Sequence, residues 1–353
     1  STPLYSSAAS DVYKRQVIGA LAPIPALQRW RPPPRHGVSA VKTMLTGRVP
    51  DDGRIYLAAA AGDSPFAPGT PLEPGLALVD PTPTWVYPDF PEEPAELLAA
   101  DIPILYSGPD ALVVDKPHGL PSTPNGRLLR ATVQSLMRVR LGEPELVAAH
   151  RLDRDTRGLL VLSRNPATRG FLQSQFQRRE VEKTYQAMAP DIPEIGAQWQ
   201  EVTLPMLKVK DDPQVRVGSA AALPTQPTLS TQLKPQGRAK STVTRIRKLA
   251  TRRCVATSET NAAAGTAATA VYELQPRTGH THQLRALMNH LGAPIYGDDT
   301  YPAYCPGTGA LQLRAVAIEL ALVASQEKGE LKNRQRIAIE RCLEDPWSQW
   351  NRG

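Results

Sequence analysis

The sequence contains few cysteines and no long apolar run, and both absences restrict the class of protein. Its three cysteines, Cys254, Cys305 and Cys342, lie far apart and form no Cys-x-x-Cys pair. They provide neither a disulfide framework nor a zinc site, so we expect a reducing, cytoplasmic compartment. No apolar run reaches the ~18 residues of a membrane-spanning helix, so we expect no membrane partner.

The N-terminal part of the chain lacks the features of a signal peptide. Residues 1–17 contain no apolar segment of the secretory type and resemble translated adapter sequence, so we predict a leader foreign to the natural protein. Residues 18–97 are rich in proline, and their central part predicts short strands broken by turns. We therefore expect an accessory module and linker over 18–97, a larger domain over 98–345 and a tail over 346–353.

Charge is distributed unevenly along the chain. The composition, 41% hydrophobic and 21% charged over 353 residues, is typical of a globular protein. Residues 1–97 hold 8 Lys and Arg against 10 Asp and Glu, whereas residues 98–353 hold 33 against 24. A basic excess on one domain indicates attraction to phosphate, although it also improves solubility. The acidic N-terminal part favours a packing or linker role.

Local patterns in the larger domain predict both helices and strands. A helix is expected over 131–141, because Gly142 suits the left-handed cap position. A second helix is expected from Pro166, a favoured residue of the first turn, to about Arg179. The expected strands are 111–116, 159–162 and 182–189.

The segment HRLDRDTRGLLVLSR at 150–164 carries the clearest chemical signal. It places Asp153 between Arg151 and Arg154, just before an apolar run. Nearby positive charge lowers the pKa of a carboxyl group, so we expect Asp153 to be ionised at neutral pH. An ionised carboxylate suits a nucleophile better than a general acid. Taken alone, the same pattern also fits an ordinary cluster of ion pairs.

Two other kinds of chemistry find little support. Asp153 and Asp155 form a carboxylate pair, but glycosidase chemistry needs two carboxylates across a bond, and no separated partner is identifiable. His280 and His282 form a His-x-His pair in front of an expected helix after Gly279. If the helix includes both, they lie about 200° apart and cannot chelate one ion. We therefore expect no metal.

A basic stretch follows in the second half of the chain. Between Lys234 and Arg253 there are eight Lys and Arg and no acid. As a strand paired with 270–275, it would present Arg245 and Arg247 on one face, able to lie along an RNA backbone. Alternatively, the charges protect an edge strand from aggregation. Its neighbouring segments 218–237 and 256–269 are low in complexity and predict surface loops.

The helix after Gly279 contributes another cation. Arg285 lies near its N-terminal end, where free N–H groups and the helix dipole favour negative charge. Arg285 is therefore expected either to pair with a carboxylate from elsewhere in the chain or to bind a phosphate.

In order, the blocks HRLDRDTRG, KTY at 183–185 and RTGHTHQLRALMNHLGAPIYGD at 277–298 resemble the motifs of RluA-type pseudouridine synthases. The resemblance covers about residues 98–322. It implies that Asp153 is the nucleophile and that Arg285 pairs with it. It also implies that Tyr185 stacks on the target base and helps to remove a proton. The candidate substrate-binding residues are Arg151, Arg154, Lys183, His282, Arg245 and Arg247.

Three residues differ from the usual family pattern, and the resemblance also implies a fold and an activity. Arg157, His280 and Arg314 stand where the family usually has other residues, and Arg157 is our expected determinant of target preference. The implied fold is α+β, a mixed, mainly antiparallel central sheet flanked by helices, with a small degenerate N-terminal module. The implied activity is isomerisation of uridine in structured RNA, with rRNA preferred over tRNA, by a monomer without cofactor. The alternative is a catalytically inactive RNA-binding protein of the same fold.

Overall fold

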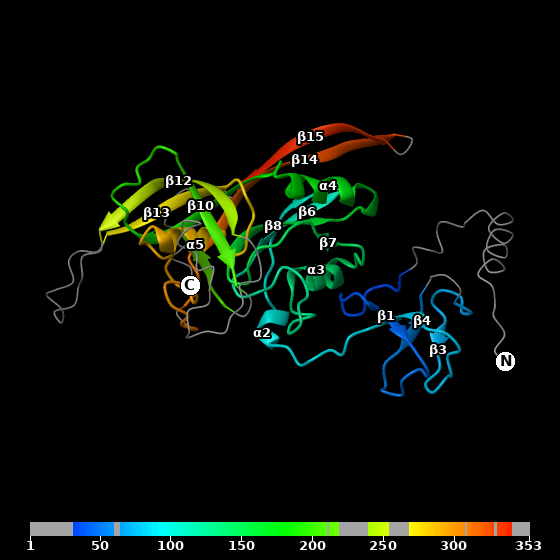
Figure 1. The fold of residues 1–353 in the computed structure, drawn as a ribbon. Coiled ribbons are helices and arrows are strands. Elements are labelled where there is room, and N and C mark those ends of the chain that lie inside the picture. Colours follow the sequence, from blue (N-terminus) through cyan, green and yellow to red (C-terminus); the bar gives the residue numbers. More distant parts are fainter. Residues whose placement is uncertain are drawn as a thin grey trace, which may run out of the picture. The chain divides into compact units, whose positions relative to one another are not determined.

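The computed structural model describes residues 31–59, 64–209, 212–218, 239–253, 268–307, 309–327 and 330–340. The expected leader 1–17, the tail 346–353 and most of the two expected loops lie outside these residues. The chain divides into two compact units, Ser1–Pro91 and Glu92–Gly353, which are coloured along the sequence in Figure 1.

The first unit is a four-stranded antiparallel sheet in the order β1-β4-β2-β3. Its strands are β1 (Val41–Leu45), β2 (Tyr56–Ala58), β3 (Pro71–Leu72) and β4 (Thr82–Val86). Tyr56, Leu72 and Val86 belong to its small apolar core. Short strands separated by turns are what the proline- and glycine-rich sequence predicts.

The second unit is built on an eleven-stranded sheet, whose main path runs β11-β10-β12-β13-β9-β14-β8-β6-β5. Strand β15 pairs with β14, and β7 pairs with β8. The strands are β5 (Ile104–Ser107), β6 (Ala111–Lys116), β7 (Val147–Ala148), β8 (Arg157–Ser163), β9 (Glu182–Pro190), β10 (Gln200–Lys208), β11 (Val215–Val217), β12 (Lys240–Arg253), β13 (Ala268–Pro276), β14 (Leu313–Glu327) and β15 (Glu330–Glu340). Among the described strands only the β14–β8 pair is parallel, so the expected mixed, mainly antiparallel α+β fold is confirmed.

The helices of this unit are α2 (Ala95–Leu98), α3 (Val133–Leu141), α4 (Pro166–Arg178) and α5 (Gln283–His290). The Thr132 hydroxyl accepts from the Ser135 N–H at the start of α3, and Gly142 ends it with φ 64°. Asn165 caps α4 in the same way, ahead of Pro166. The local signals for both helices are therefore confirmed. Figure 1 shows α4 beside β14, which forms a long hairpin with β15.

The parallel contact of β14 with β8 requires a glycine. Gly158 has φ +108°, and a Cβ atom built on it would lie 2.1 Å from the Ala315 carbonyl oxygen. Only a residue without a side chain permits this approach. It brings β14 against the start of β8, directly after the loop that carries Asp153.

Two expectations about local structure need correction. Strand β12 pairs with β13 over Thr244–Arg253, as predicted, but it also pairs with β10 over Lys240–Ile246, so the edge-strand alternative is wrong for the part of β12 that carries Arg245. Helix α5 begins only at Gln283, because His282 adopts a left-handed conformation with φ 52°. His280 and His282 therefore precede the helix instead of lying on it.

Candidate active site

A cleft of about 700 Å³ opens beside α5 and β9 in the second unit. Six of the nine predicted site residues line it: Arg151, Asp153, Lys183, Tyr185, His282 and Arg285. They come from the β7–β8 loop, from β9 and from the start of α5, which are far apart in the sequence. Arg154, Arg245 and Arg247 are not among its lining residues.

Asp153 lies in the cleft wall on a loop whose backbone is held on both sides. On one side, Leu152 and Ser122 exchange two hydrogen bonds of 3.0 Å, Ser122 Oγ to the Leu152 carbonyl and the Leu152 N–H to Ser122 Oγ. On the other side, the Lys116 Nζ donates to the carbonyl oxygen of Arg154 at 2.6 Å. Fixing both neighbours positions the half-buried Asp153 side chain without occupying its carboxylate.

Lys116 is the central support of this loop. It is fully buried, and its Nζ donates to the carbonyl oxygens of Pro117, Leu120 and Arg154. Burial lowers the pKa of Lys116 to about 7, although the negative charges of Asp155 and Asp153 act in the opposite direction and raise it. Three acceptors match the three protons of an ammonium group, so the protonated form satisfies the whole arrangement.

Tyr185 presents its ring to the same cleft from the middle of the sheet. It lies on β9 between Leu274 of β13 and Ala315 of β14, and it is almost completely buried. Burial raises the pKa of Tyr185 above its ordinary value, and the charge of Asp153 adds to the effect. Tyr185 is therefore a neutral phenol at physiological pH, which suits stacking on a base and hydrogen bonding.

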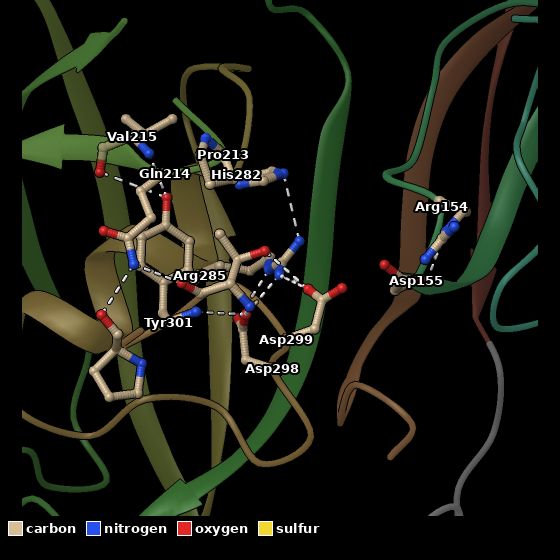
Figure 2. Close-up of polar contacts among 12 residues, drawn as sticks. Arg154, Asp155, Pro213, Gln214, Val215, His282, Arg285, Asp298, Asp299 and Tyr301 are labelled. Carbon is tan, nitrogen blue, oxygen red and sulfur yellow. Dashed lines mark hydrogen bonds and ion pairs between the residues drawn. The ribbon is translucent and has the colours of Figure 1, made fainter. Parts of the chain in front are cut away.

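Arg285 binds different carboxylates from the one expected. Its Nε and Nη2 donate to the two Asp298 oxygens at 2.8 and 2.5 Å, and Nη2 also donates to Asp299 at 2.9 Å. Figure 2 shows this fork, with His282 on its other side. Among the described contacts, no hydrogen bond or ion pair joins Arg285 to Asp153. The expected direct pair is thus not formed, although the two charges lie close enough to interact.

The reason lies in the turn after α5. Asp298 is buried and accepts N–H groups from Thr300 and Tyr301 in addition to the Arg285 fork. Burial alone lowers the pKa of Arg285, but the hydrogen bonds and charge of Asp298 raise it above its ordinary value. A bidentate, buried pair of this kind fixes the guanidinium firmly in the cleft wall.

His282 lines the cleft with an imidazole ring that is only partly paired. Its Nδ1 is buried and has no hydrogen-bond partner within the described part of the chain. Burial lowers the pKa of His282, while the charge of Asp153 raises it. A neutral ring with an unused nitrogen is well suited to contact a substrate. No group of three possible metal ligands occurs among the described residues.

The sequence of the chain is similar to those of known proteins. The family model described as RNA pseudouridylate synthase matches residues 110–290, just over half of the chain. The chain belongs to the RNA pseudouridylate synthase family. It is 28% identical over 247 residues to "Ribosomal large subunit pseudouridine synthase C" of Vibrio cholerae, covering 68% of each chain. It is 29% identical over 218 residues to "Dual-specificity RNA pseudouridine synthase RluA" of Vibrio vulnificus, covering 62% of this chain and 76% of that one.

The RluA-type relationship and the isomerase activity expected from the motifs are thereby confirmed. A solved structure, "Human RNA Pseudouridylate Synthase Domain Containing 1", aligns with 72% of this chain and 87% of its own, at 22% identity and a TM-score of 0.49. No helix among the described residues is long and apolar enough to cross a membrane.

The predicted basic hairpin of the synthase faces away from the cleft. Across β12, β13 and β9, Ile246, Leu274 and Tyr185 are successive partners. Arg245 precedes Ile246 and pairs with Gln275. Neighbouring side chains on a strand point to opposite faces, so Arg245 projects from the face opposite to Tyr185.

Arg247 lies on the same outer face as Arg245. Both guanidinium groups stack on Trp199, with centroid distances of 4.9 and 4.5 Å, and Arg247 also forms an ion pair with Glu273. Neither arginine reaches the cleft directly.

Three other arginines are also bound elsewhere. Arg154 is largely exposed and pairs with Asp155 at 3.1 Å, as a separate group in Figure 2. Arg157 donates to Gln312 at 3.1 Å and is not a lining residue, so the structure gives no support for it as the determinant of target preference. Arg314, in register with Arg157, forms a buried ion pair with Asp115.

Sequence reasoning assigned no role to Lys116, Asp298 or Asp299, although Asp298 ends the last quoted motif and Asp299 follows it. A lysine inside an otherwise buried strand was a usable signal, because a buried ammonium group needs several acceptors. A second usable signal was the pair of consecutive acids, Asp298 and Asp299, shortly after a helix that carries an arginine.

Proposed function

We propose that Asp153 is the nucleophilic carboxylate of RNA uridine isomerisation, with Tyr185 against the target base and Arg285 in the wall of the same cleft. The observation that carries the proposal is the convergence of these three side chains on one cleft, with the backbone on both sides of Asp153 held in place. A preorganised carboxylate beside an aromatic ring is what this reaction needs.

The chemistry follows from these positions. A uridine must leave its helical stack before its glycosidic bond is accessible, and an aromatic ring such as Tyr185 stabilises the extruded base by stacking. Asp153 then attacks the nucleotide or stabilises it as the bond from ribose C1′ to uracil N1 breaks. The uracil turns and its C5 bonds to C1′, which displaces Asp153 wherever Asp153 had formed a covalent bond. A base removes the C5 proton, and uracil N1 gains a proton. The product is an isomer of the substrate, so atoms and electrons balance.

His282 and two cations complete the proposed substrate contacts. His282 lines the cleft, and its Nδ1, buried and unpaired among the described residues, would hydrogen-bond the base once substrate binding exposes it. Arg151 is exposed at the cleft, and Lys183 is half-buried in its wall, so both are suited to RNA phosphates. Arg245 and Arg247 fit only RNA that also reaches the outer face of the sheet, and Arg154 fits RNA that passes the exposed loop.

We propose large-subunit rRNA as the first substrate and tRNA as the second. The first choice follows the name of the Vibrio cholerae relative, and the name of the Vibrio vulnificus relative says that one such enzyme has two specificities. We further propose a cytoplasmic monomer. Its accessory module at 18–97 would act in packing or as a linker, since residues 1–97 carry two more acids than bases. Light scattering in solution tests the monomer.

The decisive assay follows tritium released from uracil C5 in rRNA and tRNA transcripts. We expect release by the wild-type protein and its loss, by at least ~10³-fold, in Asp153→Asn, because the neutral amide cannot replace a nucleophile. Asp155→Asn is the matched control, since Asp155 pairs with Arg154 and does not line the cleft.

Two outcomes would contradict the proposal. RNA binding without tritium release from any transcript would favour the inactive RNA-binding protein. Release that persists in Asp153→Asn would instead remove Asp153 as the nucleophile.

A further inference from the structure

A second, smaller pocket of about 230 Å³ adjoins the active-site cleft. The two share a wall formed by Phe176, Lys183, Pro276, Thr278, Gly279 and His280. The second pocket extends from this wall to the C-terminal end of α4, where Gln177, Arg179 and Val181 line it. The two pockets are therefore neighbours on either side of shared residues.

The lining of the second pocket is strongly basic. Arg179, Lys183, Arg277 and His280 line it, and no Asp or Glu does. Lys183 makes no hydrogen bond or ion pair with any described residue, and its Nζ lies 3.8 Å from the position of a Cβ built on Gly279. Among the described residues, the Arg277 side chain has only a 3.9 Å contact with Glu182, and both of those side chains are substantially exposed.

A further cation acts electrostatically on a lining residue of the pocket. Burial lowers the pKa of His280, and the charges of Lys240 and Arg179 lower it further. Lys240 is the first residue of β12. Like charges repel one another, and the exposed 3.9 Å contact of Arg277 with Glu182 balances only one of them, so the cluster is best satisfied by an anion from outside.

The backbone at Arg179 is an independent sign that this pocket is functional. Arg179 ends α4 in the left-handed conformation, with φ 62°, at a position that usually holds glycine. His282, in the wall of the cleft, is another such residue. Non-glycine residues in this conformation are strained, and they concentrate at functional sites.

We propose that the second pocket binds a backbone phosphate of the RNA substrate, next to the nucleotide held in the active-site cleft. The proposal deepens the proposed function and rests on it. The pocket lining carries Arg179, Lys183 and Arg277 and no acid, so the pocket suits an anionic phosphodiester group better than a second, neutral base. Arginine and lysine are the usual partners of such phosphates.

The test compares the double variant Arg179→Gln/Arg277→Gln with Arg178→Gln. Arg178 is the matched control because it precedes Arg179, has a side chain that is 67% exposed and lies outside the pocket. RNA binding is measured by fluorescence anisotropy over a series of salt concentrations, with a transcript that the wild-type protein modifies. KM and kcat are measured by tritium release.

For each lost phosphate contact we expect the salt dependence of log K to become shallower by ~0.7–0.9. We expect KM to rise by about tenfold for the double variant, with a smaller effect on kcat, because the contact forms already in the ground state. A salt slope and a KM equal to those of Arg178→Gln would overturn the proposal.

Arg179→Gly separates loss of binding from misfolding. Glycine relieves the backbone strain at this position, so we expect an equal or higher melting temperature together with weaker RNA binding. Unchanged affinity in this variant would count against the pocket, since the fold is then intact and the side chain is gone.

Neutral methylphosphonate linkages locate the contact. One linkage beside the target uridine is replaced, on the 5′ side or the 3′ side. At the position that the pocket contacts, we expect the methylphosphonate to weaken RNA binding by the wild-type protein. The same replacement should barely change the affinity of the double variant, because that protein has already lost the contact. If, at both positions, the methylphosphonate lowers the affinity of the double variant as much as that of the wild-type protein, the proposal is overturned. If no RNA is modified at all, the proposed function fails, whereas the salt slopes with bound RNA still test the pocket.

Discussion

The Lys116 side chain donates a hydrogen bond to the backbone carbonyl oxygen of Arg154 at 2.6 Å, one residue beyond Asp153. This contact joins β6 to the loop that carries the proposed nucleophile, and Ser122 fixes the residue on its other side. The position of Asp153 thus depends on residues from a neighbouring part of the sheet, not only on the HRLDR segment itself.

Replacing Lys116 with methionine should therefore displace the Asp153 loop. We expect kcat for tritium release to fall by about 10- to 100-fold, because a shift of ~1 Å at a reacting group is enough for such a loss. We also expect a loss of about 1–3 kcal/mol in the free energy of unfolding, since three buried carbonyl groups lose their donor. Exposed Lys42, replaced in the same way, is the control. Activity within twofold of the wild-type value would contradict this role.

Asp298 and Asp299 should differ in how strongly they support Arg285. Asp298→Asn removes one side of a buried, bidentate pair, and breaking such a pair costs ~3–5 kcal/mol. Asp299 is partly exposed and accepts one Arg285 hydrogen bond, so Asp299→Asn should cost about 1 kcal/mol. Urea denaturation of both variants gives this order directly, and kcat should fall in the same order. Equal effects of the two substitutions would refute the assignment of Asp298 as the main anchor.

Glu93 should make stability depend on pH. Its buried carboxylate accepts the N–H groups of Leu129, Arg130 and Ala131 just before α3. Burial alone raises the pKa of Glu93, but these hydrogen bonds and Arg130 outweigh it, so the pKa is lowered. A lowered folded-state pKa contributes stability that is complete above the unfolded-state pKa of ~4.3 and is lost as pH falls through the folded-state pKa.

Glu93→Gln should then lose about 1–3 kcal/mol of unfolding free energy at pH 7. It should also lose less stability than the wild-type protein between ~pH 5 and 3. The neighbouring, exposed Glu92→Gln serves as the control. Denaturant titrations across this pH range decide the matter, and parallel pH profiles for Glu93→Gln and the wild-type protein would rule the contribution out.

Gly158 and Gly170 should respond to alanine in opposite directions. At Gly158, with φ +108°, the new Cβ would meet the Ala315 backbone, so Gly158→Ala should lose more than ~3 kcal/mol. At Gly170, inside α4, nothing lies within 4 Å, and alanine should gain ~0.5–1 kcal/mol. Thermal melts of both variants check the contrast. A Gly158→Ala protein as stable as the wild type would show that β14 and β8 do not need this close approach.

Local sequence determined the elements whose signals lie within a few residues. Thr132 and Gly142 delimit α3, Asn165 and Pro166 begin α4, and these caps act through hydrogen bonds and dihedral preferences of the same segment. The motifs likewise named Asp153, Tyr185 and Arg285, which the structure gathers in one cleft.

Only the tertiary structure decided which of the charged residues meet. Arg285 pairs with Asp298 and not with Asp153, because the turn after α5 brings a buried carboxylate directly to the guanidinium. Arg245 and Arg247 face away from the cleft, because a strand alternates its faces and the register with β13 fixes which residues point inward. Charge and spacing along a chain specify neither the partner nor the face, since both are set by pairing between segments distant in sequence.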